Sequence, residues 1–168
     1  MDKIKAAIDK SEYGYDDFLN YRIGEDWLDE KLEEAYPGNW YGGLVPTLSF
    51  AMEVEMESKV VWERILPNEG MVSNCPVLMC PDDNDFSCTL IIAAIENKGD
   101  IIEWQKLGLD QTKEFDPEMV GTTVNWFENI QAFIFEKQAY LKMIEAFRKE
   151  FNMTKKMWEQ KFDEKLNR

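Results

Sequence analysis

The feature that most constrains the fold is an apolar run from Cys88 to Ile95, bounded by polar turn residues on both sides. Because the run is apolar on both faces, it predicts a strand at the centre of a sheet. A second apolar run, 76–80, precedes it, and the Pro, Asp and Asn residues of 81–85 between the two runs favour a turn. These segments predict a β-hairpin. A further turn at 97–100 leads into 101–107, so we expect three consecutive strands in an antiparallel meander.

The segments on either side of this meander have helical spacing. In the first part, Ile4 and Ile8 lie four residues apart, followed by apolar groups at 15–19 and 27–35 that also suggest short helices. After Pro117, apolar residues recur at three- and four-residue steps from about 124 to 151, and a last helix is expected from about Thr154. The expected fold is α+β, a small antiparallel sheet of three to five strands with short N-terminal helices and a long C-terminal helical segment. We expect one domain over 1–168, helical over 1–46, sheet over 47–110 and helical over 111–168.

The segment 48–57 has two interpretations. Leu, Phe, Met, Val and Met alternate with Ser, Ala and three glutamates, which favours a half-buried strand. The same residues are good helix formers and follow Pro46, so a helix is the alternative. We favour the strand, and in either case Glu53 and Glu57 share a face.

Charge and composition exclude several functions. The chain has 19 Lys and Arg against 33 Asp and Glu, giving a net charge of −14, and residues 1–110 carry all of the excess negative charge. Such a surface repels phosphate backbones and anionic lipids, so we expect a basic protein as partner, with no nucleic acid and no membrane. The alternative is a solvated acidic surface that only keeps the chain soluble, in which the loop at 82–85 is a plain turn. There is no histidine, which excludes Ser/His and Cys/His nucleophiles and histidine-containing zinc sites.

Cofactors, metals and enzymatic activity are not expected either. The acidic loop at 82–85 fails the EF-hand pattern, because strand residues occupy the later ligand positions. Adjacent carboxylates are common in so acidic a chain, and neither a nucleophile elbow nor a phosphate-binding loop accompanies them. Cys75, Cys80 and Cys88 form no Cys-x-x-Cys pair, and we expect them to be reduced, mostly buried thiols. The first residues lack an apolar stretch, so we expect a soluble, cytoplasmic chain.

The segment 40–46 places Trp40 and Tyr41 beside two glycines. Large aromatic residues in such a loop serve either as a packing corner or as exposed recognition residues, and both interpretations stay open.

The segment from Asn74 to Thr89, together with the Trp-Gln-Lys-Leu-Gly of 104–108, resembles small immunity proteins of bacterial polymorphic-toxin systems, over a region from about Trp62 to Gly108. The resemblance implies a non-enzymatic inhibitor whose acidic surface covers a basic toxin, such as a nuclease. A structural or adaptor module, and less so a carboxylate-dependent enzyme, are the alternatives, and the oligomeric state is open. The partner-binding residues expected on this basis are three aspartates of the hairpin tip, three glutamates and two aromatic anchors: Asp82, Asp83, Asp85, Glu53, Glu55, Glu57, Trp40 and Tyr41.

Overall fold

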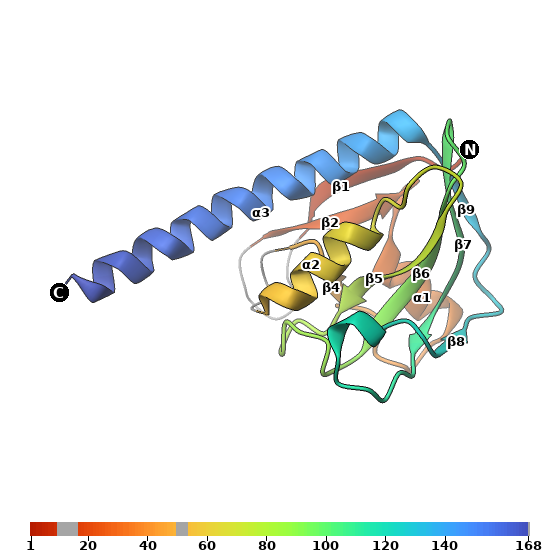
Figure 1. Ribbon diagram of the computed structural model, residues 1–168. Helices are drawn as coiled ribbons and strands as arrows, with labels where there is room; N and C mark the ends of the chain where they lie inside the picture. The colour runs from red at the N-terminus through yellow and green to blue at the C-terminus, as the bar shows by residue number, and fades with distance from the viewer. Residues whose placement is uncertain (10–16, 50–53, 168) are drawn as a thin grey trace.

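A computed structural model describes residues 1–9, 17–49 and 54–167 (Figure 1). Its strands form two sheets, and every pair of neighbouring strands in them is antiparallel. The α+β class and the long C-terminal helix are as expected. The larger sheet has six strands in the described part of the chain, however, which exceeds the expected three to five.

The predicted meander forms the centre of the larger sheet. Its strands are β5 (Val72–Met79), β6 (Leu90–Asn97) and β7 (Ile101–Asp110), paired in sequence order. Six consecutive residues of β6, Leu90 to Ile95, are buried, which confirms its central position. The hairpin prediction is therefore confirmed, although both of its strands are displaced by a few residues from the apolar runs.

Three short strands complete this sheet. β4 (Val45–Pro46) pairs with β5, while β8 (Val124–Trp126) and β9 (Phe133–Glu136) share the free edge of β7. Gly108 permits the close approach of β8, since a Cβ atom there would lie 2.7 Å from the carbonyl oxygen of Asn125. The prediction of helix over residues 124–136 is thus wrong, because Phe133 and Phe135 alternate along a strand that pairs with the first half of β7.

The N-terminal part contains a three-stranded sheet where helices were expected. β1 (Ile4–Asp9) pairs with β2 (Phe18–Ile23), and β3 (Asp26–Trp27) follows after a turn. The helix prediction for these residues is wrong because Tyr21 and Ile23 alternate into the core, a period of two. The spacing of Ile4 and Ile8 fits a strand as well as a helix. The expected helix at 27–35 is confirmed as α1 (Leu28–Ala35).

Helix α2 (Glu55–Arg64) replaces the strand favoured for 48–57. Residues 50–53 lie outside the described residues, so the correction applies to Glu55–Glu57 and to the turn at Thr47 and Leu48. The alternative interpretation was right for Glu55 onward. The buried residues Val60, Val61 and Ile65 hold this segment on the core, a tertiary contact that local alternation does not reveal.

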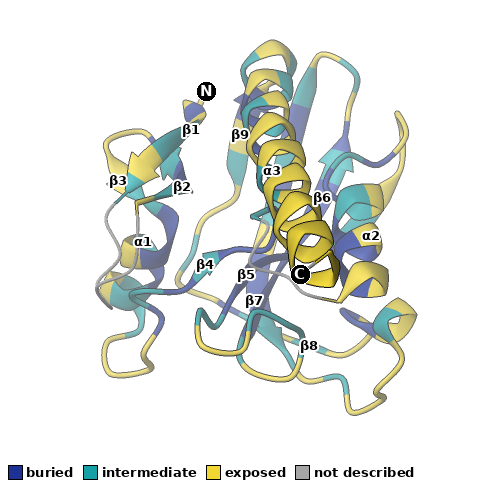
Figure 2. Cartoon of the chain, turned by 90° about the vertical axis from the view of Figure 1, so that its left-hand side faces the viewer, coloured by how far each residue is buried: buried dark blue, intermediate teal, exposed yellow. Residues whose placement is uncertain are grey.

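The C-terminal segment is one continuous helix, α3 (Lys137–Leu166), so the predicted break before Thr154 is absent. Its first half packs beside α2 over the sheets and buries Tyr140, Met143 and Phe147. Its second half projects beyond the sheets, as Figures 1 and 2 show. Among the described helices, none has both the length and the apolar character needed to cross a bilayer.

The two sheets and α3 meet in an aromatic cluster. The ring of Tyr21 on β2 lies 5.7 Å from Trp104 on β7 and 5.2 Å from Phe147 on α3. The Tyr140 hydroxyl donates to the carbonyl oxygen of Ile65 at 2.6 Å and accepts from Trp104 Nε1 at 3.1 Å. The Tyr140 hydroxyl, the Trp104 indole N–H and the Ile65 carbonyl are therefore hydrogen-bonded inside the core.

Candidate functional site

An acidic pocket of about 260 Å³ lies where three segments meet. The segments are the first turn of α2, the β5–β6 hairpin tip, and the connection from β7 to the 3₁₀ helix η1 (Pro117–Met119). Five carboxylates line it, namely Glu57, Asp85, Asp110, Glu114 and Asp116. Among the described residues that line the pocket, Lys113 is the only basic one. We call this pocket, with the hairpin tip at 81–89, the acidic end.

Glu57 connects α2 to the hairpin tip. Its carboxylate accepts a hydrogen bond from the backbone N–H of Phe86 at 3.1 Å, and the residue is buried. Burial raises the pKa of Glu57, the hydrogen bond from Phe86 lowers it in part, and the nearby negative charge of Asp85 raises it further. A carboxylate in the first turn of a helix is favoured by the helix dipole. The structure thus brings together two of the expected residues, Glu57 and Asp85.

Three further carboxylates of the pocket hold its loops in place. Asp85 accepts hydrogen bonds from the backbone and hydroxyl of Ser87. Asp110 accepts from the hydroxyl of Thr112 at 2.7 Å and from the backbone N–H of Gly121 at 3.1 Å. Asp116 caps η1 by accepting from the backbone N–H of Glu118 at 3.0 Å. These groups fix the shape of the acidic end, since each satisfies backbone donors that no regular element would use.

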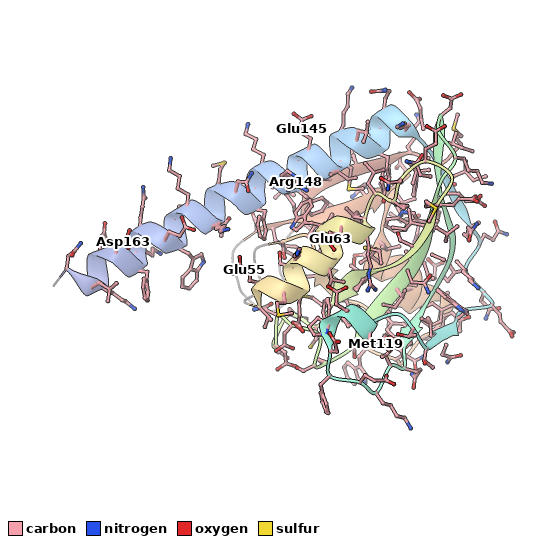
Figure 3. The ribbon with its side chains drawn as sticks, viewed as in Figure 1. Glu55, Glu63, Met119, Glu145, Arg148 and Asp163 are labelled. Atoms are coloured by element: carbon pink, nitrogen blue, oxygen red, sulfur yellow. The ribbon has the colours of Figure 1, made fainter. Side chains whose placement is uncertain are left out.

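The other expected carboxylates that the structure describes face solvent. Asp82 and Asp83 are exposed at the hairpin tip. Glu55 is exposed at the start of α2, toward the opposite end of that helix from Glu63 in Figure 3. Their charge is therefore available to a partner.

An aromatic side chain stands beside these charges. Phe115 lines the pocket and is fully exposed. Burying such a ring against a partner releases on the order of 2–3 kcal/mol. An aromatic group inside a charged rim has the arrangement of a protein-binding hot spot.

The guanidinium of Arg64 positions the segment around η1 against α2. It donates to the carbonyl oxygens of Val120 at 2.6 Å, Glu118 at 2.7 Å and Asn74 at 3.2 Å. The guanidinium of Arg64 is thus hydrogen-bonded to backbone carbonyl groups, not to the carboxylates of the pocket. The negative charge of the acidic end stays largely uncompensated.

The two expected aromatic anchors lie apart from the acidic pocket. Tyr41 is buried, its ring 5.5 Å from that of Phe127, and it lines a second pocket of about 340 Å³ that shares no lining residue with the first. Trp40 is largely exposed and has a positive φ of 62°. The loop therefore combines a packing residue with an exposed one. Glu53 lies outside the described residues.

The cysteines divide into two kinds. Cys75 is buried, as expected, and burial raises the pKa of its thiol. Cys80 is half-buried and Cys88 is exposed, so the expectation of a buried thiol is wrong for Cys88. One ligand atom each of Cys80, Asp83 and Cys88 lie within 4.8 Å of one another at the hairpin tip.

The sequence analysis missed the contribution of 110–118 to the site. The sequence signal there is one aromatic residue, Phe115, among four acidic ones from Asp110 to Glu118. This segment reaches the hairpin tip only through the fold of η1 against α2, which has no local signature.

Comparison of the chain with protein-family models, curated proteins and solved structures gives no match.

Proposed function

We propose that the protein is a non-enzymatic inhibitor of the immunity type, which uses its acidic end to cover the basic surface of a toxin. The observation that carries the proposal is the convergence of carboxylates from three segments around a pocket that also presents the exposed ring of Phe115. Lys and Arg side chains that hold substrate phosphates in a nuclease are complementary to such a surface. Acting in the cytoplasm of the producing cell is part of this proposal.

The hydrogen bonds of the pocket favour binding over catalysis. A general acid or base needs a carboxyl group that can exchange its proton with a substrate. Glu57, Asp85, Asp110 and Asp116 instead accept hydrogen bonds from backbone N–H groups of other residues of the protein. Rigid loops that present charge without reorganising reduce the entropic cost of association.

The test is association with the toxin domain encoded beside this chain's gene, measured at low and high salt. The acidic-end variant Asp82→Asn/Asp83→Asn/Glu114→Gln removes three exposed negative charges. A matched control, Glu145→Gln/Glu150→Gln/Glu159→Gln, removes three exposed charges from α3. We expect the acidic-end variant to associate at least tenfold more slowly with a flatter salt dependence, and the control to lose much less. Equal on-rates for the two variants would contradict the proposal.

A second measurement addresses Phe115. The substitution Phe115→Ala removes the exposed ring and leaves every charge in place. We expect a faster dissociation rate with an unchanged on-rate, because apolar contacts form after the charge-steered encounter. Wild-type dissociation would exclude Phe115 from the interface.

A structural or adaptor role is the second candidate, favoured by the distal half of α3. Met153, Met157, Phe162 and Leu166 are each more than half exposed on that projecting segment. Exposed apolar side chains at this density mark interaction sites. A concentration-dependent dimer in sedimentation, lost in Met157→Glu/Phe162→Glu, would favour this role, and a monomer at all concentrations would speak against self-association.

A further inference from the structure

Two thiols and a carboxylate converge at the base of the hairpin tip. Cys80 directly follows β5, Cys88 lies two residues before β6, and Asp83 is part of the loop between them. One ligand atom from each of these three side chains lies within 4.8 Å of the other two. Cys80 is half-buried, while Asp83 and Cys88 are exposed, so an ion can reach the cluster from solvent.

The fold of the hairpin explains this convergence. Met79 and Leu90 are the last paired residues before the loop, so the chain on either side leaves the sheet at adjacent positions. The backbone N–H of Asn84 donates to the carbonyl oxygen of Cys80 at 3.3 Å, and Asn84 has a positive φ of 54°. This turn folds the loop back over its own start, which carries Asp83 toward the two sulfur atoms.

We propose that Cys80, Asp83 and Cys88 bind a divalent cation of the zinc class, with a fourth position open to water. Sulfur supplies two of the three donors, which selects Zn²⁺ and similar ions over Ca²⁺ and Mg²⁺, since those take oxygen ligands. With Zn–S bonds of about 2.3 Å, a tetrahedral ion needs its sulfur atoms about 3.8 Å apart. Donor atoms within 4.8 Å need to move by about 1 Å, and the side chains of an irregular loop permit this.

Binding such an ion leaves the charge of the tip unchanged. With both cysteines as thiols and Asp83 ionised, the cluster carries one negative charge. The divalent ion binds two thiolates and one carboxylate, two protons leave to solvent, and the total is again −1. The bound ion would therefore order the loop that carries Asp82 and Asp85 without weakening its attraction for a basic partner.

The protonation of the thiols gives the site a pH dependence. The divalent ion must displace the protons of both thiols, so its affinity rises with pH and binding releases acid. Proton release is a readout that a carboxylate-only site does not give.

The test uses the whole protein, reduced with a non-thiol phosphine under anaerobic conditions, and titrated with Co²⁺ and then Zn²⁺. We expect one Co²⁺ per chain with sulfur-to-cobalt charge-transfer absorption, displacement by Zn²⁺, and release of about two protons per ion near neutral pH. The site is measured without any partner. Its failure is thus separate from failure of the proposed function.

Two variants and a matched control locate the ion. Cys88→Ser should abolish the charge-transfer band, and Asp83→Asn should weaken binding at least tenfold. Asp82→Asn removes the adjacent exposed carboxylate and should bind as the wild type does. Asp83 and Cys88 are exposed, so neither substitution should unfold the chain, and circular dichroism checks this.

Several results would overturn the proposal. These are absence of the absorption band in the wild type, an unchanged band in Cys88→Ser, or equal losses for Asp82→Asn and Asp83→Asn. The reduced protein could also bind no ion and form a Cys80–Cys88 disulfide with hydrogen peroxide, with loss of two protons and two electrons. That result would make the pair a redox dithiol instead of a metal site.

Discussion

Two regions of the molecule differ in how their side chains meet solvent. One is the aromatic cluster, which lies between the two sheets, and the other is the acidic end. In the cluster, Tyr21, Trp104, Tyr140 and Phe147 are fully or almost fully buried and meet edge to face or tilted. At the acidic end, carboxylates occupy loops and a helix start, and Phe115 stands fully exposed among them. One region is made by excluding water and the other by presenting charge to it.

The residues that stabilise the core are therefore different from those proposed to bind a partner. The cluster joins β2, β7 and α3, three elements that are far apart in sequence. The acidic end is held by short-range hydrogen bonds to backbone groups and by Arg64. Exposed charges there can therefore be changed while the core stays intact.

Truncating the cluster should have the largest effect. Phe147→Ala leaves a cavity where two sheets and α3 meet, and should lower the free energy of unfolding by about 3–5 kcal/mol. The matched control is Phe162→Ala on the same helix, where the side chain is 63% exposed and the change should stay within about 0.5 kcal/mol. Urea denaturation measures both. Equal losses would show that the distal half of α3 contributes to the core after all.

Removing one hydroxyl from the cluster should have an intermediate effect. Tyr140→Phe keeps the ring but deprives the Ile65 carbonyl of its donor and Trp104 Nε1 of its acceptor. Two buried polar groups left unpaired should cost about 1–3 kcal/mol. Tyr36→Phe, whose hydroxyl accepts from the exposed N–H of Asn129, is the control. A loss no greater than that of the control would mean that water replaces the missing hydroxyl.

Neutralising Glu57 should have a small effect of opposite sign. Its pKa is raised in the folded protein above the ordinary glutamate value of 4.5, mainly by burial, so folding favours the protonated carboxyl group. The wild type therefore gains stability from this residue as pH falls through the folded-state pKa, and carries a penalty above it. Glu57→Gln keeps an oxygen acceptor for Phe86 N–H and should be more stable than the wild type at pH 7, by a margin that narrows toward pH 4.5.

The control for that experiment is Glu55→Gln, in the same helical turn but exposed. Glu55→Gln loses the same interaction between a carboxylate and the helix dipole, but the exposed Glu55 carries no penalty for burying its charge. Denaturation curves for both variants at several pH values separate the two contributions. A margin for Glu57→Gln that is independent of pH would contradict the raised pKa.

Removing exposed charge from the hairpin tip should have the smallest effect on stability. Asp82→Asn/Asp83→Asn should change the unfolding free energy by less than about 0.5 kcal/mol, because both side chains are exposed. Thermal unfolding in low salt measures this. A large loss of unfolding free energy would show that the hairpin tip contributes to the stability of the core, and would contradict the separation of the two regions.

How far the sequence predicts each region depends on how local its contacts are. The meander was predictable because its apolar runs and turns are contiguous from 76 to 107. The spacing of Ile4 and Ile8 is even, so it satisfies both helix and strand, and only pairing with β2 decides between them. The alternation before Glu57 involves good helix formers, and burial of Val60 and Val61 on the sheet selects the helix.

The acidic end was predictable only in part for the same reason. Asp82, Asp83 and Asp85 follow one another in a visible turn, and Asp85 does reach Glu57 across the pocket. Asp110, Glu114, Phe115 and Asp116 join them because Arg64 ties the η1 segment to α2, more than fifty residues away in sequence. The Cys80–Asp83–Cys88 cluster depends likewise on the path of the loop, which residue spacing alone does not define.

The long helix α3 also gives the molecule an electrical polarity. It carries eight Lys or Arg and five Asp or Glu, a net +3, whereas the residues before it sum to −18. In Figure 1, α3 runs along the upper side of the molecule and η1 lies on the lower side; Pro117 of η1 lines the acidic pocket. This separation is a permanent dipole, which would turn the molecule in the field of the proposed basic partner before contact. Helix α3, none of whose residues line the pocket, would thus help to orient the pocket toward the proposed partner.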